Sequence, residues 1–197
     1  CPANHRLWCC WKISEFDEIF SDKFELLTLN DLSITTDVEE TGITFHQNAL
    51  IKATQYFKLS KIPTISEDSG LEVEELNGEP GIYSARYGGS GLNDQERVSL
   101  ILKKLINVSH NKRQARFVSV ICGVGFSKEP LYSEGILDGF IAQQKEGNNG
   151  FGYDPIFLPN GSKKTTASML KEEKNKISHR RRAIDKFLKM LITDKII

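Results

Sequence analysis

Stretches with a helical repeat alternate along this chain with strand-like stretches, and this alternation restricts the possible folds more than any other feature. Residues 12–20 place apolar side chains on one helical face, residues 24–29 are typical of a short strand, and residues 45–57 again have a helical repeat. Such alternation indicates an α/β protein. With 197 residues, the chain can bury roughly 70% of its unfolded surface, so it needs no disulfide or metal to hold a core.

Capping residues mark the start of two helices. Thr44 and Gln47 have the spacing of a capping box ahead of residues 45–57, and Asn93 and Glu96 have the same spacing ahead of another apolar repeat. A last helix is expected from about residue 178 to residue 192. The apolar positions expected to face inward in these three helices are Phe45, Ala49, Ala53, Phe57, Val98, Ile101, Leu102, Leu105, Ala183, Ile184, Phe187, Leu188 and Leu191.

The middle of the chain predicts several strands. A strand that begins at Pro63 is expected to end at the acidic turn 68–70, and a second strand is expected to follow from Leu71. Two longer stretches, 115–126 and 131–143, predict an extended antiparallel hairpin that forms a second lobe. The glycine-rich segment 147–152 is expected to be a loop.

The formal net charge is zero, because 26 Lys and Arg balance 26 Asp and Glu, and this excludes a generic polyanion-binding protein. The charges are nevertheless separated along the chain. Residues 31–79 carry ten acidic and three basic side chains (3 − 10 = −7), whereas residues 163–189 carry ten basic and three acidic ones (10 − 3 = +7). Two interpretations stay open: ordinary solvated surfaces, or the acidic and basic halves of one site.

The first eleven residues differ from the rest of the chain. They hold three of the four cysteines and both tryptophans, and only Cys122 lies in the body of the sequence. An isolated thiol is typical of the reducing interior of a cell, so we expect a cytoplasmic protein. No stretch approaches the ~20 apolar residues of a membrane helix. We therefore expect an atypical N-terminal segment, 1–11, before a single soluble domain, 12–197.

Three clusters carry chemistry. Asp68 stands where a strand meets a glycine, and Asp68 with a distant Glu39 or Glu40 supplies the oxygen ligands that Mg²⁺ prefers; the alternative is an acidic turn. Arg180 begins an arginine run in the first turn of the last helix, where each cation is disfavoured by roughly 0.3 to 1 kcal/mol unless an anionic ligand is present. The alternative is a solvated basic surface. The segment 151–154 offers aromatic rings to stack on a base, although taken alone it is more typical of packing.

Taken together, these segments closely resemble the inosine triphosphate pyrophosphatase family, the noncanonical purine nucleoside triphosphate pyrophosphatases, in its bacterial form. The matching stretches occur in family order: VEETGITFHQNALIKA (38–53), SEDSGLEVEELNGEPGIYSARYGG (66–89), QAR (114–116), GFGYDPIF (150–157) and EEKNKISHRRRAI (172–184).

The resemblance implies a hydrolase acting on phosphoric anhydride bonds, which converts dITP, ITP or XTP to the monophosphate and pyrophosphate and so cleanses the nucleotide pool. It implies an elongated two-lobed α/β fold with a central twisted mixed sheet flanked by helices and an active site in the cleft between the lobes. It further implies Mg²⁺ as cofactor and a homodimer, with no nucleic-acid or membrane partner.

The resemblance also implies residue roles. Glu39 and Asp68 match the metal ligands, Asp68 matches the base that activates the attacking water, Lys12 matches a catalytic lysine that contacts phosphate, and Phe151 matches the ring that stacks on the base. The positions that match substrate contacts are Lys12, Lys52, Ser69, Phe151, Gly152, Tyr153, Asp154, Lys174, His179 and Arg180.

One segment departs from the family pattern. The family begins with an apolar strand that leads into a Thr/Ser-x-Asn-x-x-Lys loop, but here Leu7 stands at the Thr position and Cys9 at the Asn position. We expect no counterpart of the strand in this chain. One alternative is therefore a nucleotide-binding protein of the same fold with impaired catalysis. Another is a nucleic-acid-binding module that uses the basic C-terminal region.

Overall fold

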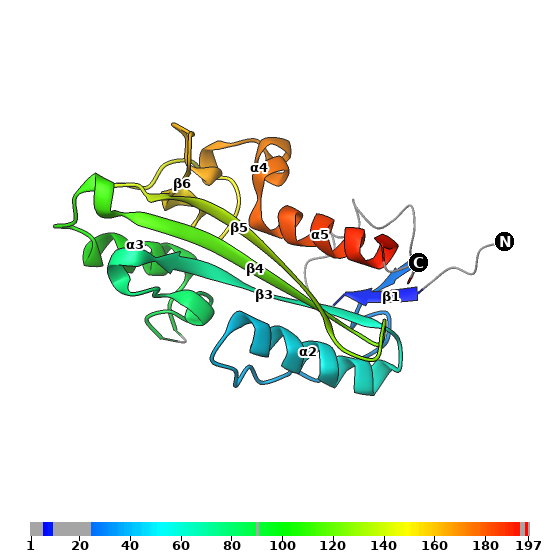
Figure 1. Ribbon diagram of the computed structural model, residues 1–197. Helices are drawn as coiled ribbons and strands as arrows, with labels where there is room; N and C mark the ends of the chain where they lie inside the picture. The colour runs from blue at the N-terminus through cyan, green and yellow to red at the C-terminus, as the bar shows by residue number, and fades with distance from the viewer. Residues whose placement is uncertain (1–5, 10–24, 90, 194–195, 197) are drawn as a thin grey trace. The chain divides into compact units, whose positions relative to one another are not determined.

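The computed structural model describes residues 6–9, 25–89, 91–193 and 196, and it has the α/β composition expected from the sequence (Figure 1). None of the described helices is both long enough and apolar enough to cross a membrane. The strands are β1 (Arg6–Cys9), β2 (Glu25–Leu27), β3 (Thr64–Val73), β4 (Gln114–Val124), β5 (Leu131–Ile141) and β6 (Phe157–Pro159). The helices are α2 (Phe45–Ser60), α3 (Asp94–Lys104), α4 (Lys171–Ile177) and α5 (His179–Thr193).

The strands form one six-stranded sheet in the order β2-β1-β3-β4-β5-β6. Strand β1 runs parallel to both of its neighbours, with Trp8 opposite Thr64 of β3, whereas β6 runs antiparallel to β5, with Pro159 opposite Gly139. The sheet is therefore mixed, as predicted. The short β6 lies against a glycine because a Cβ on Gly139 would lie 2.2 Å from the carbonyl oxygen of Leu158.

One prediction about strands was wrong, and another stays untested. Residues 6–9 form the strand β1, which includes Leu7 and Cys9, the positions matched to the phosphate loop. The residues before Arg6, where the family strand was expected to lack a counterpart, lie outside the described residues. The strand that begins near Pro63 does not end at the acidic residues but continues as β3 to Val73. Carboxylates are tolerated inside this buried strand because basic side chains from other elements contact them. The helix predicted at 12–20, and Lys12 with it, lies outside the described residues.

The helix starts follow from local capping. The side chain of Thr44 accepts a hydrogen bond from Gln47 N, and Gln47 Oε1 accepts one from Ile43 N, so α2 begins where predicted. Asn93 and Glu96 form the full reciprocal capping box of α3.

The chain divides into two compact units, each made of separate stretches. The first holds residues up to Asp68, 119–135 and those from Arg180 onward; the second holds 69–118 and 136–179. The predicted cleft between two lobes stays a prediction.

The core of the first unit lies between α5 and the sheet. It consists of Ile65, Ile121, Ala183, Ile184, Phe187 and Leu191, all fully buried. A Cβ on Gly123 would lie 2.4 Å from the ring of Phe187, so only glycine leaves room for this ring on β4. The inward face predicted for the last helix is confirmed, with Leu188 partly buried at its margin.

The core of the second unit contains a buried arginine beside its apolar cluster, which includes Leu71, Val98 and Phe157. Arg113 is 4% exposed, and its guanidinium donates three hydrogen bonds to backbone carbonyls. The acceptors are Val108 at 3.1 Å, Ala142 at 2.8 Å and Leu105 at 2.6 Å. Arg113 therefore ties the end of α3 and the end of β5 to the start of β4.

Candidate active site

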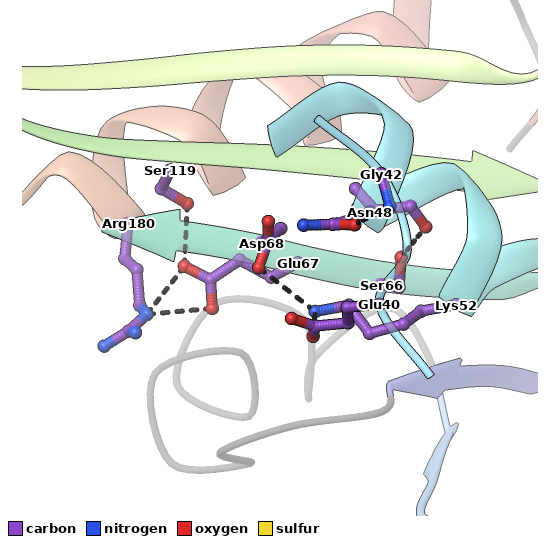
Figure 2. Close-up of polar contacts among 10 residues, drawn as sticks. Glu40, Gly42, Asn48, Lys52, Ser66, Glu67, Asp68, Ser119 and Arg180 are labelled. Atoms are coloured by element: carbon purple, nitrogen blue, oxygen red, sulfur yellow. Dashed lines mark hydrogen bonds and ion pairs between the residues drawn. The ribbon is translucent and has the colours of Figure 1, made fainter. Parts of the chain in front are cut away.

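In the first unit, one strand and one helix bring the predicted site residues together. Strand β3 carries Glu67 and Asp68, whose side chains leave the strand on opposite faces. Helix α2 carries Asn48 and Lys52, which are four residues apart and therefore share a helix face. The loop before α2 supplies Glu40, and Figure 2 shows its side chain beside Lys52 and Asp68.

Two carboxylates converge on Lys52. Its Nζ lies 2.5 Å from Glu40 Oε1 and 3.3 Å from Asp68 Oδ1. Burial lowers the pKa of Lys52, but the charges of Asp68 and Glu40 outweigh burial, so the net shift is upward and the lysine stays charged. Burial raises the pKa of Asp68 to about 6, with Lys52 opposing the shift and Glu40 adding to it.

The chemistry of this pair fits a divalent cation. Asp68 Oδ2 is buried and has no hydrogen-bond partner among the residues that the structure describes, so one oxygen of a charged group lacks compensation. Carboxylates from Asp68 and Glu40, completed by water and substrate phosphate, form the kind of shell that Mg²⁺ accepts. No group of three or more acidic, histidine or cysteine side chains that could hold a metal by protein ligands alone occurs in the described part of the chain.

The predicted ligand Glu39 is not brought to this pair. Its side chain is exposed, and within the described ranges no contact joins it to Lys52 or Asp68. Neighbouring residues on an extended loop point in different directions, and here the second glutamate of the pair faces the helix.

Glu67 was not among the predicted site residues, yet it holds Arg180. The Nε of Arg180 lies 2.7 Å from Glu67 Oε1 and 2.8 Å from Oε2, and Ser119 Oγ donates to Oε1 at 2.7 Å. All three residues are buried, and Figure 2 shows the contacts that join them. The cation at the start of α5 is thus compensated by a carboxylate of the same unit. In the sequence, Glu67 had no feature that separated it from the neighbouring acids.

In the second unit, Asp154 organises the predicted base-binding segment. Its Oδ2 accepts from Lys174 Nζ at 2.6 Å and from Phe151 N at 2.8 Å, and its Oδ1 accepts from Thr166 Oγ1 at 2.9 Å. Asp154 is 3% exposed. A Cβ on Gly150, whose φ is +77°, would lie 2.1 Å from Asp154 Oδ2, so the loop can close over this carboxylate only with glycine there.

Lys174 is fixed over the aromatic ring expected to stack on the base. Its Nζ lies 4.6 Å from the centroid of the Phe151 ring, within cation–π range. The Phe151 residue is 43% exposed. Asp154 therefore holds a cation and a ring in one fixed arrangement, and both groups are suited to a flat heterocycle with carbonyl oxygens.

Two further predicted residues of this unit, Gly152 and Tyr153, anchor the same segment to other elements. The Tyr153 hydroxyl donates to the carbonyl of Ser84 at 2.9 Å, and Gly152 N donates to Asp94 at the start of α3. His179 stacks on Phe117 with ring centroids 4.8 Å apart and an interplanar angle of 11°. Ser69 is half-buried on β3.

Comparison with known proteins gives a consistent result. The family model described as the Ham1 family matches residues 11–190. The chain is 42% identical over 184 residues to a dITP/XTP pyrophosphatase of Oceanobacillus iheyensis, covering 92% of this chain and 93% of that one. It is 45% identical over 184 residues to a dITP/XTP pyrophosphatase of Staphylococcus aureus, covering 93% of each.

A solved structure gives the same answer for the fold. The Ham1 protein of Staphylococcus aureus superposes with a TM-score of 0.88 at 41% identity, over 96% of this chain and 99% of that one. Sequence and fold agree over nearly the whole length, and the chain belongs to the Ham1 family.

Proposed function

We propose that this protein is a hydrolase that converts noncanonical purine nucleoside triphosphates, dITP, ITP and XTP, to the monophosphate and pyrophosphate. The observation that carries the proposal is the partly buried group of Asp68, Lys52 and Glu40, in which two carboxylates converge on one fixed ammonium. Relatives named dITP/XTP pyrophosphatase match almost the full chain, and this supports the choice of substrate.

Asp68 is suited to accept a proton from the attacking water. In the metal-free protein burial raises its pKa to about 6, so Asp68 is mostly ionised at pH 8 and can accept a proton. A bound cation lowers this pKa again. The water oxygen then bonds to the α-phosphorus while the bond from that phosphorus to the bridging oxygen breaks. The proton passes to Asp68, and pyrophosphate leaves with the electron pair of the broken bond.

Charge that develops on the phosphates requires cations at fixed places. Lys52 is held by Glu40 and Asp68, so its ammonium is already oriented before substrate arrives. We propose Mg²⁺ as the cofactor, held by Asp68 and by Glu40, the carboxylate that the structure brings to it. When bound, this ion supplies electrostatic stabilisation of the phosphate oxygens.

The base is proposed to stack on Phe151. Lys174, held by Asp154, donates only and therefore favours a purine that presents carbonyl oxygens, as hypoxanthine and xanthine do. Adenine presents an amino group at the position of the 6-keto oxygen, and an amino group facing His179 or Arg180 leaves a buried donor unpaired. Unpaired polar groups give large discrimination between otherwise similar substrates.

The test is pyrophosphate release measured in parallel with dITP, XTP, dATP and dGTP in the presence of Mg²⁺. We expect kcat/KM for dITP and XTP to exceed the values for dATP and dGTP by about a hundredfold or more. Equal rates with all four substrates would remove the proposed specificity. No pyrophosphate from any of them would remove the proposed activity.

We also propose that the protein is a homodimer in the cytoplasm. The motifs resemble a family whose members are usually dimeric, and Cys122 is a free, buried thiol. Analytical ultracentrifugation of the purified protein tests the dimer, and a monomeric mass at micromolar concentration would contradict it.

A further inference from the structure

One fully buried polar side chain beside Asp68 has no assigned role. Asn48 lies on α2, one helical turn before Lys52, and is 0% exposed. Asparagine is disfavoured inside helices because its amide competes for backbone hydrogen bonds. A buried amide at this place therefore needs a reason beyond the stability of the helix.

One end of the Asn48 side chain binds the loop before α2, which carries Glu40. Its Oδ1 accepts a hydrogen bond from Gly42 N at 2.8 Å, two residues after Glu40. The contact is tightly packed, because a Cβ on Gly42 would lie 2.6 Å from Asn48 Oδ1 and 2.7 Å from Gln47 Cβ. This hydrogen bond therefore fixes the distance between α2 and the loop that carries Glu40.

The other end of the side chain faces the reactive carboxylate. Asn48 Nδ2 and Asp68 Oδ2 are both buried, and neither makes a hydrogen bond of ordinary geometry in the described part of the chain. Although burial raises the pKa of Asp68 and has the larger effect, the Asn48 amide is near enough to lower that pKa. Figure 2 shows the Asn48 amide directed toward the Asp68 carboxylate. The amide nitrogen is a donor and the carboxylate oxygen is an acceptor, so a small movement of either side chain brings them into hydrogen-bond distance. Hydrogen bonds in active sites often tighten only when the site is loaded.

We infer that Asn48 is a positioning residue that ties the loop of Glu40 to Asp68 and so sets the separation of the two carboxylates for a divalent cation. The amide bonds Gly42 N through its oxygen and Asp68 Oδ2 through its nitrogen, which leaves the second lone pair of Oδ2 for the cation. Residues that orient metal ligands typically change metal affinity or activity tenfold to a hundredfold when removed. The inference rests on the proposed function, because it concerns the same carboxylates.

The chain offers a matched control. Ser66 is 1% exposed, lies on β3 and donates from Oγ to the carbonyl of Ala49 on α2 at 2.5 Å. Ser66→Ala therefore removes a buried hydrogen bond between the same helix and the same strand, but within the described residues Ser66 has no hydrogen bond to the loop or to Asp68. Asn48→Leu keeps the branched shape and the number of side-chain heavy atoms and removes both ends of the amide.

The experiment measures binding of Mn²⁺ alone by electron paramagnetic resonance, together with hydrogen exchange of the Gly42 amide in metal-free protein. We expect Asn48→Leu to weaken Mn²⁺ binding about tenfold or more and to speed exchange at Gly42, whereas Ser66→Ala stays within about twofold of the wild type in both. Gly42→Ala forces the loop away from Asn48 without altering the amide. It is expected to weaken Mn²⁺ binding as well, and it tests the link if Asn48→Leu does not fold.

Several outcomes would overturn the inference. One is a folded Asn48→Leu variant that binds Mn²⁺ as tightly as the wild type, even with faster exchange at Gly42, because Asn48 would then only stabilise the loop. Another is a wild-type protein that binds no Mn²⁺. A wild type that binds Mn²⁺, shows the expected effects of the variants and releases no pyrophosphate would contradict the proposed function alone.

Discussion

Replacing Asp68 by asparagine is expected to abolish activity and, at the same time, to stabilise the metal-free protein at alkaline pH. Asp68 is 8% exposed, and burial raises its pKa to about 6 from an ordinary value of 3.8. Since a tenfold change in acidity corresponds to about 1.4 kcal/mol, the ionised carboxylate lowers the free energy of unfolding at pH 8 by about 3 kcal/mol. Asparagine has no charge to bury.

The sign of this effect sets the pH window. Below pH 3.8 the carboxyl is protonated in both the folded and the unfolded chain, so it has no effect on stability there. Between that value and about pH 6 the unfolded chain ionises first, so the wild type loses stability as the pH rises. Of the total loss in unfolding free energy of about 3 kcal/mol, about 2 kcal/mol occurs between pH 4.5 and pH 8. Once the pH is well above the folded-state pKa, the unfolding free energy no longer changes with the ionisation of Asp68.

The assay is urea unfolding of the wild type and of Asp68→Asn at several pH values from 4.5 to 8, with EDTA present. The quantity compared is the difference in unfolding free energy between the two proteins as a function of pH. Effects of asparagine that do not depend on pH shift this difference by a constant and do not alter its change with pH. Asp138→Asn, which removes an exposed carboxylate on β5, serves as the surface control. A difference that stays flat across this range would refute the reasoning that Asp68 is ionised at the expense of stability.

Three further predictions concern other residues. Glu40→Gln is expected to weaken Mn²⁺ binding about tenfold or more, and Glu39→Gln much less; the reverse order in a calorimetric titration would restore Glu39 as the ligand. Arg113→Met should destabilise the protein by about 2 to 5 kcal/mol, because the carbonyls of Val108 and Ala142 lose this donor while that of Leu105 keeps only Val108 N. A denaturation midpoint unchanged from the wild type would contradict this. Burial raises the pKa of Cys122 to about 12, so its thiol should resist iodoacetamide at pH 8 until urea unfolds the chain; peptide mapping that finds Cys122 alkylated in folded protein would show that it is accessible.

Local signals in the sequence were sufficient for the helices. Asn93 and Glu96 predicted the start of α3 because a capping box depends on residues three positions apart. The apolar repeat of the last helix predicted its buried face because a 3.6-residue period is independent of the partner surface. The same holds for the two long strands, whose lengths and connecting turn are visible in the sequence and correspond to β4 and β5.

The course of β3 was not predictable in the same way. Acidic residues followed by a glycine are typical of a turn, but here the buried Glu67 is compensated by Arg180, 113 positions later in the chain. No local pattern reports such a partner. Which of Glu39 and Glu40 lies beside Lys52 depends likewise on the direction of the loop relative to α2. That direction cannot be inferred from two adjacent positions in the sequence.

The two adjacent carboxylates of β3 show why only one of them is suited to catalysis. Both are buried, but Glu67 meets a guanidinium nitrogen at both oxygens and a serine hydroxyl at one of them. Asp68, on the opposite face of the strand, has one contact to Lys52 at 3.3 Å and an oxygen with no partner among the described residues. A buried carboxylate whose oxygens already have hydrogen-bond or ionic partners is stabilised little by binding a proton or a cation. A carboxylate with an oxygen that lacks such a partner is stabilised much more by either. Strand β3 places the compensated and the partly uncompensated carboxylate one residue apart, and the partners supplied by α5 and α2 determine which is which.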